Sequence, residues 1–202
     1  MKVLLGISGA SGAAYGVRTL SLLLARGADL HVLVTKTAWG ILASEVWDGD
    51  LPNGMNARQK GLARIVASTR PFRLYAEDDF GIPFASGSNP PDAMIIAPCS
   101  MGTLGRIAHG TSSSVLTRCA DVALKERRPL VLVARETPLS VIHLENMLAL
   151  ARAGAHVLPA CPGFYHRPET VSGLVDFVAS RALSCIGVDA GILPRWGEGK
   201  EE

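Results

Sequence analysis

The stretch GISGASGAAYG, residues 6–16, ends the first apolar run of the chain and predicts a glycine-rich turn between a strand and a helix. Glycines allow the backbone to approach a ligand closely, and the N-terminus of the following helix favours an anion. The spacing is neither that of the dinucleotide fingerprint nor that of the P-loop. We therefore expect either a phosphate-bearing ligand smaller than a dinucleotide or a plain turn with Ser11 as helix cap.

Apolar runs and helical patterns alternate along the rest of the chain, which favours an α/β fold with a doubly wound parallel sheet. We expect a single domain over residues 1–202 with a frayed tail from about residue 197, and an exposed, mobile loop at residues 48–62. Strands are expected at residues 2–8, 29–35, 72–77, 93–100, 129–135 and 155–160, and helices at 13–27, 38–46, 101–110, 114–126, 140–154 and from about 168.

Composition excludes several classes of protein. The net charge is only +2, which gives no electrostatic case for nucleic acid, and no apolar run approaches the roughly 20 residues that a membrane span requires. The first strand begins at residue 2, so we expect no signal peptide. Four cysteines stand far apart without C-x-x-C spacing, which indicates reduced thiols in the cytoplasm, and the histidines show no metal-ligand spacing.

Polar and charged residues follow the other predicted strands, where doubly wound sheets bind ligands. Ser100–Thr103 begins a helix after one strand and predicts a second anion site, or again a plain cap. Arg135 and Glu136 leave a buried strand as a charged pair. Four cationic or hydroxyl side chains could supply a second anion pocket beside a mononucleotide, with Glu136 moving a proton: Lys125, Arg135, Tyr165 and Arg181.

Five motifs together resemble the UbiX-type flavin prenyltransferases: GISGASGAAYG, PCSMGTL, RCADVALKERRPLVLVARETPLSVIHLENM, PGFYHRPETV and LPRWGE. The resemblance runs from residue 3 to about residue 198. It implies a Rossmann domain of the flavodoxin-like type, a three-layer sandwich, that binds FMN. Such enzymes join a dimethylallyl group to reduced FMN at N5 and C6 without a metal, and dimethylallyl monophosphate is the usual donor. The product serves a UbiD-type decarboxylase. The resemblance also implies a homo-dodecamer with active sites where subunits meet.

The resemblance assigns roles residue by residue. Glu136, Ser11, Glu45 and Lys125 match catalytic positions. The family positions that bind FMN correspond to Gly9, Ala10, Ser11, Thr35, Ser100, Met101, Gly102, Thr103 and Arg118. The family positions that bind dimethylallyl phosphate correspond to Ser86, Gly87, Lys125, Arg135, Tyr165, Arg181 and Trp196. The roles of Glu45 and Trp196 depend on the resemblance alone.

Two other functions stay open at this point. An FMN-dependent cysteine decarboxylase of the related fold would need a histidine after the first helix region, yet the chain has none between residues 32 and 108. A flavin carrier without catalysis would not need Lys125, Glu136 and Arg181 in one pocket. Prenyltransferases that use a diphosphate hold magnesium with paired acid-rich motifs. The sequence has one acidic cluster, Glu-Asp-Asp at residues 77–79, and no second cluster to pair with it, so we expect a solvated loop there.

Overall fold

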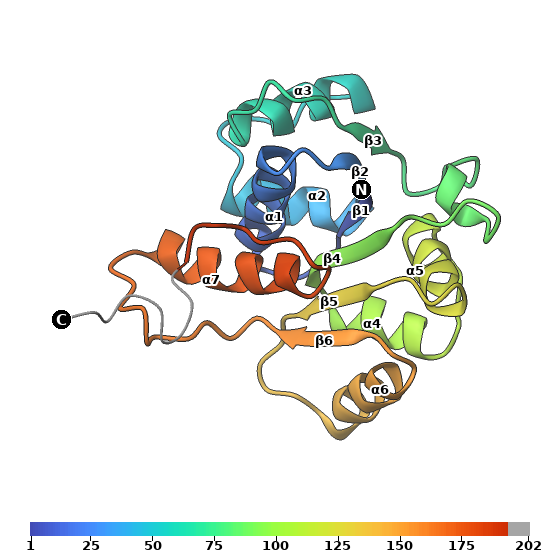
Figure 1. The fold of residues 1–202 in the computed structure, drawn as a ribbon. Coiled ribbons are helices and arrows are strands. Elements are labelled where there is room, and N and C mark those ends of the chain that lie inside the picture. The colour runs from blue at the N-terminus through green and yellow to red at the C-terminus, as the bar shows by residue number, and fades with distance from the viewer. Residues whose placement is uncertain (194–202) are drawn as a thin grey trace.

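The computed structural model describes residues 1–193, and its centre is a six-stranded parallel sheet in the order β3-β2-β1-β4-β5-β6 (Figure 1). The doubly wound fold expected from the sequence is confirmed. Strand order reverses between β1 and β4, and ligands of such sheets bind at the carboxyl ends beside that reversal. The strands are β1 (Lys2–Ile7), β2 (Asp29–Val34), β3 (Arg73–Tyr75), β4 (Ala93–Cys99), β5 (Leu130–Ala134) and β6 (His156–Pro159).

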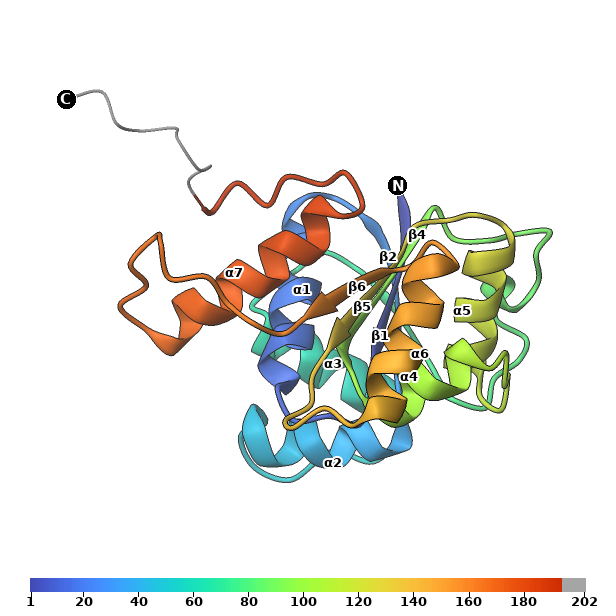
Figure 2. The ribbon, with the colours of Figure 1, turned by 90° about the horizontal axis from the view of Figure 1, so that it is seen from below.

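Helices cover both faces of the sheet, because alternate strand residues point to opposite sides. Val3, Leu5 and Ile7 of β1 pack in one core with α1, α2, α3 and α7, whereas Leu4 packs in a second core with α4, α5 and α6. Figure 2 shows α1 and α7 on one side of the strands and α4, α5 and α6 on the other. The helices are α1 (Ala13–Ala25), α2 (Lys36–Glu45), α3 (Met55–Ile65), α4 (Met101–Ala108), α5 (Val115–Lys125), α6 (Val141–Arg152) and α7 (Val171–Ser184), with a short 3₁₀ turn, η1 (Pro83–Ala85).

The expectation of an irregular, mobile loop at residues 48–62 is wrong over most of that stretch, because α3 begins at Met55. The helix is anchored by Leu62, which is fully buried in the first core with Trp47 and Phe72. The Arg58 guanidinium also lies 4.8 Å from the centre of the Trp39 ring, a cation–π contact. Leu62 is the one buried residue of α3, so the sequence carries little of the apolar periodicity that reveals a helix.

His31 is a buried titratable residue on the second face of the sheet, 2% exposed. Its Nδ1 lies 2.8 Å from the Tyr75 hydroxyl, and the Phe84 ring packs against it edge-on. Burial is the largest effect on the pKa of His31 and lowers it, although Asp29 opposes the shift and Arg73 and Lys2 add to it. His31 therefore binds a proton at a lower pH in the folded protein than in the unfolded chain.

We expect the free energy of unfolding to fall as the pH is lowered from about 7.5 to about 5.5, since an unfolded histidine binds its proton near pH 6.5. Urea titrations at several pH values measure this decline. The His31→Gln variant should be less stable at neutral pH but should lose less stability on acidification. An equally steep decline in that variant would exclude His31 as the cause.

Candidate functional site

The β1–α1 turn brings together the first group of predicted site residues. Gly12 precedes α1 with φ +100°, a left-handed conformation that favours glycine. The backbone N–H groups of Gly12 and Ala13 both donate to one carboxylate oxygen of Glu45, each at 2.8 Å. Glu45 is the last residue of α2, so this contact ties the end of α2 to the N-terminus of α1. Ser11 also bonds the Glu45 side chain.

Glu45 stays ionised in this position. Burial is the largest single effect and would raise the pKa of the carboxyl, but the hydrogen bonds from Ser11, Ala13 and Gly12, together with the charge of Arg135, lower it below its ordinary value. The α1 N-terminus is thus complemented by a fixed negative charge. A side chain that the resemblance alone assigned is held directly beside Ser11.

Capped helices follow β2 and β4, as expected. Thr35 accepts a hydrogen bond from the Ala38 N–H at the start of α2, and Ser100 accepts one from the Thr103 N–H at the start of α4. Ser8 links the two neighbouring strand ends, because its hydroxyl donates to the Pro98 carbonyl at 2.9 Å and accepts from the Ser100 N–H at 2.8 Å. The sequence pattern gives no sign of this role of Ser8, apart from its position directly after β1.

Arg135 and Glu136 line a small cavity of about 110 Å³ beyond β5, together with Met101, Ala134, Thr137, Leu139, Met147, Pro159, Ala160 and Cys161. The Arg135 Nε is buried and has no hydrogen-bond partner among residues 1–193. Because Arg135 acts on the pKa values of both Glu45 and Tyr15, it lies beside the β1–α1 turn. The residues at the ends of β1, β4 and β5 therefore form one continuous polar site.

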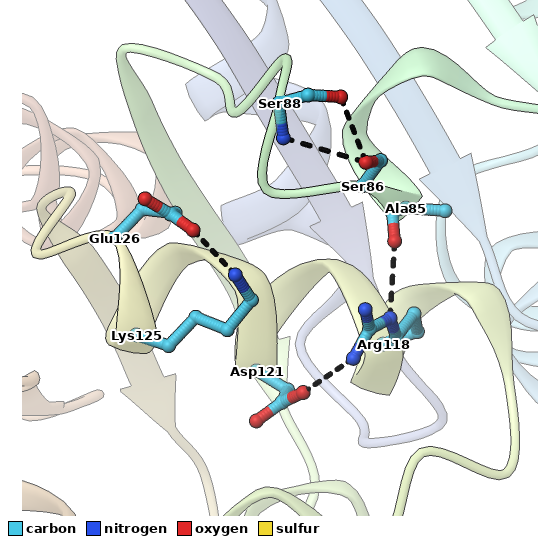
Figure 3. A network of polar contacts seen from close by, with 7 residues as sticks. All are labelled: Ala85, Ser86, Ser88, Arg118, Asp121, Lys125 and Glu126. Carbon is cyan, nitrogen blue, oxygen red and sulfur yellow. Dashed lines mark hydrogen bonds and ion pairs between the residues drawn. The ribbon is translucent and has the colours of Figure 1, made fainter.

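Lys125 lies in a different place, on the flank of α5 that faces residues 85–88 (Figure 3). Gly87 allows its close approach, since a Cβ there would lie 2.3 Å from the Lys125 Nζ. The Lys125 ammonium pairs with Glu126. Two turns earlier on the same flank, the Arg118 Nε donates to the Ala85 carbonyl at 3.0 Å and its Nη1 pairs with Asp121 at 2.7 Å.

Tyr165 and Arg181 meet in a third place, a cavity of about 440 Å³ between α7 and residues 187–193. None of the residues that line this cavity also lines the cavity of Arg135 and Glu136. Arg181 is exposed near the C-terminal end of α7, and Tyr165 is 51% exposed. The loop after β6 and the last helix thus present a hydroxyl and a guanidinium to the same space.

The family model described as Flavoprotein matches residues 1–183. A curated relative from Pseudomonas aeruginosa, flavin prenyltransferase UbiX, is 48% identical over 98% of this chain and 94% of its own length. The chain belongs to the flavin prenyltransferase family.

Two solved structures place the fold within this family as well. One is a UbiX, also called PadA1, in complex with FMN and dimethylallyl pyrophosphate, 36% identical with a TM-score of 0.84 and 96% of both chains covered. The other is a dodecameric FMN-dependent UbiX-like decarboxylase from Escherichia coli O157:H7, 38% identical with a TM-score of 0.83, covering 97% of this chain and 99% of the other. The flavodoxin-like fold and the family resemblance are therefore confirmed.

The strand-end site of this flavin prenyltransferase fits the phosphate and polar ring edges of FMN. Thr35 and Ser100 place hydroxyls at the starts of α2 and α4, whereas the Gly12 and Ala13 N–H groups at the start of α1 are already bonded to Glu45. The buried Arg135 Nε has no partner among residues 1–193, and a ligand oxygen would supply one. No cluster of three or more histidine, cysteine, aspartate or glutamate residues that could hold a metal occurs in residues 1–193. Nor does any helix within that range have the length and apolar character needed to cross a membrane.

Within one chain, the four side chains expected to share a phosphate pocket lie apart. Lys125 ends α5, ahead of β5, and Arg135 follows β5, a separation of roughly 16 Å along a five-residue strand. Tyr165 and Arg181 occupy the third place described above. Ser86 and Gly87 lie with Lys125. Trp196 and the tail from residue 197 lie outside the described residues.

Proposed function

We propose that this flavin prenyltransferase joins the dimethylallyl group of dimethylallyl phosphate to N5 and C6 of reduced FMN. The observation that carries this proposal is the likeness to a solved UbiX structure, which is 36% identical and matches over 96% of both chains. That structure contains FMN and dimethylallyl pyrophosphate. The relatives named flavin prenyltransferase support the same reaction. We further propose that residues 1–202 act as one flavin-binding domain.

The residues at the ends of β1, β2, β4 and β5 are proposed to hold FMN. Bound FMN supplies the nucleophilic ring that accepts the prenyl group. Helix N-termini and hydroxyls bind its phosphate and polar edges, and Ser11 and Glu45 lie at the reacting edge. The proposed FMN contacts at these strand ends are Gly9, Ala10, Ser11, Thr35, Ser100, Met101, Gly102 and Thr103. Arg118 is a further proposed FMN contact and lies on α5.

Cationic side chains are proposed to stabilise the departing phosphate in place of a divalent ion. Lys125, Arg135 and Arg181 offer three positive charges, and a charge-assisted hydrogen bond to phosphate is stronger than a neutral one. Tyr165, Ser86 and Gly87 add neutral donors, and the family resemblance proposes Trp196 as a further contact of the prenyl donor. Glu136 carries the proton that leaves the flavin as the second bond forms.

We propose that one active site draws these residues from more than one copy of the chain. The three groups, Arg135 with Glu136, Lys125 with Gly87, and Tyr165 with Arg181, lie apart within one chain. Copies related by symmetry can bring different surfaces of the same chain to one site. A dodecamer is the proposed assembly, in keeping with the dodecameric relative.

An apolar surface on α6 supports that assembly. Val141 and Ile142 are 69% and 67% exposed, and Leu144 and Leu148 are 51% and 50% exposed. Exposed apolar side chains grouped on one helix are typical of a protein interface. We propose that α6 packs against another copy of the chain.

The product is proposed to pass to a UbiD-type decarboxylase, which uses prenylated FMN. The proposed location is the cytoplasm, because all four cysteines are free thiols and such thiols persist in reducing compartments. The donor is proposed to be the monophosphate.

Anaerobic incubation of the protein with reduced FMN and dimethylallyl monophosphate tests the reaction. We expect mass spectrometry to show that FMN has gained one five-carbon unit, and the same mixture without protein serves as the control. FMN recovered unchanged with both the monophosphate and the diphosphate would exclude prenyl transfer and leave a flavin carrier. Loss of carbon dioxide from a C-terminal cysteine peptide would instead identify a cysteine decarboxylase.

A further inference from the structure

The cavity between α7 and residues 187–193 has a polar wall that the proposed function does not fully use. Besides Tyr165 and Arg181, this wall contains Ser180, Ser184 and Asp189. The Asp189 carboxylate accepts a hydrogen bond from the Gly191 N–H at 2.8 Å, and the Ser184 hydroxyl donates to the Ser180 carbonyl at 2.9 Å. Both of these polar groups are therefore engaged within the chain.

The Ser180 hydroxyl is different. Ser180 is only 6% exposed, and its Oγ makes no hydrogen bond to any residue in the described range 1–193. A buried hydroxyl without a partner destabilises a folded protein, whereas alanine has almost the same size and no such cost. A serine at this position is therefore explained better by a ligand that completes its hydrogen bonding than by packing.

We infer that Ser180 is a further ligand for the phosphate of the prenyl donor. This inference depends on the proposed function, which assigns the phosphate to Tyr165 and Arg181. Ser180 precedes Arg181 on α7, and both line the same cavity with Tyr165. A guanidinium and two hydroxyls are all hydrogen-bond donors, and an anion with several acceptor oxygens matches this set.

The positive charge on this wall comes from Arg181, and Asp189 is the one carboxylate among the lining residues. The Gly191 N–H holds the Asp189 carboxylate in place on the 187–193 segment. Ser180, as a neutral donor, adds affinity for phosphate without adding another charge. Monophosphate and diphosphate groups both carry acceptor oxygens, so both forms of the donor are candidates for this contact.

The Ser180→Ala variant tests the inference through two effects of opposite sign. Loss of one hydrogen bond to a charged phosphate should raise the KM of the donor roughly 10-fold, with little change in kcat or in the Kd of FMN. The melting temperature of the ligand-free protein should rise, because the unpartnered hydroxyl is gone. A merely structural serine would change stability and leave the donor KM as it is.

Ser184→Ala is the matched control, since Ser184 lies four residues further along α7 on the same cavity and its hydroxyl already has a partner. It should leave the donor KM unchanged. Calorimetry of inorganic phosphate and of inorganic pyrophosphate binding to the assembled protein gives a second readout that needs no turnover. Weaker binding of either anion by Ser180→Ala, but not by Ser184→Ala, supports the inference and identifies the phosphate form.

Equal anion affinity and equal donor KM in Ser180→Ala and the unmodified protein would overturn the inference while leaving prenyl transfer in place. The opposite result is also informative. If the unmodified protein transfers no prenyl group but Ser180→Ala still binds pyrophosphate more weakly, the proposed reaction is wrong and Ser180 remains an anion ligand. The two failures are therefore distinguishable.

Discussion

Replacing Glu136 by glutamine should leave FMN bound while slowing prenyl transfer at least 100-fold, because a positioned acid or base contributes on the order of 10²–10⁴ to such a step. Glutamine has the size and shape of glutamate but cannot exchange a proton at neutral pH. Glu136 lines the cavity beyond β5 with Arg135, so the substitution changes the charge there with little change in packing. Single-turnover measurement of flavin mass, with FMN affinity by titration, separates the two effects.

Asp48→Asn serves as the control for removing one carboxylate, because Asp48 is exposed in the segment between α2 and α3. That variant should transfer the prenyl group at the normal rate. Full turnover in Glu136→Gln would remove Glu136 from the proton step. Loss of FMN from Glu136→Gln would instead give it a binding role.

The strand-end site could be predicted from the sequence because it depends on local patterns. Buried strands read as continuous apolar runs, and the residues after them must lie at one edge of a parallel sheet. That reasoning found Ser11, Ser100, Arg135 and Glu136, and the structure brings them to neighbouring strand ends. That reasoning did not identify Ser8, because a serine beside a glycine-rich turn gives no sign that its hydroxyl links two strand ends.

Helix α3 and the distribution of the phosphate ligands could not be read in the same way. α3 is held by one buried leucine and by tertiary contacts to Trp39 and Trp47, which a local pattern does not contain. Lys125 and Arg135 lie within a long recognisable motif, and Arg181 lies in the last helix. A local sequence pattern does not show on which surface of the folded chain each of these side chains lies. Sequence resemblance grouped them by role, and the fold separates them in space.

Lys125→Ala should weaken the prenyl donor far more than FMN, with a donor KM raised about 10- to 100-fold through loss of a charge-assisted contact. Lys125 lies with Gly87 on the α5 flank, away from the strand-end site, so the FMN contacts should persist. Arg181→Ala should behave similarly, because it removes the guanidinium from the cavity beside α7. Equal losses of donor and FMN affinity would contradict these assignments.

Mixing these two variants should restore activity if one site takes Lys125 and Arg181 from different copies. After co-expression in equal amounts, about a quarter of the sites should hold both residues, since each position is intact in half of the copies. If both residues came from one copy, no site would be intact and activity would stay at the level of the single variants. The double variant mixed with unmodified protein is the control: it should retain about a quarter of the activity when two copies contribute and about half when one copy does. Because Lys125 and Arg181 lie apart within one chain, the restored fraction of activity tests directly whether one site takes these two residues from different copies.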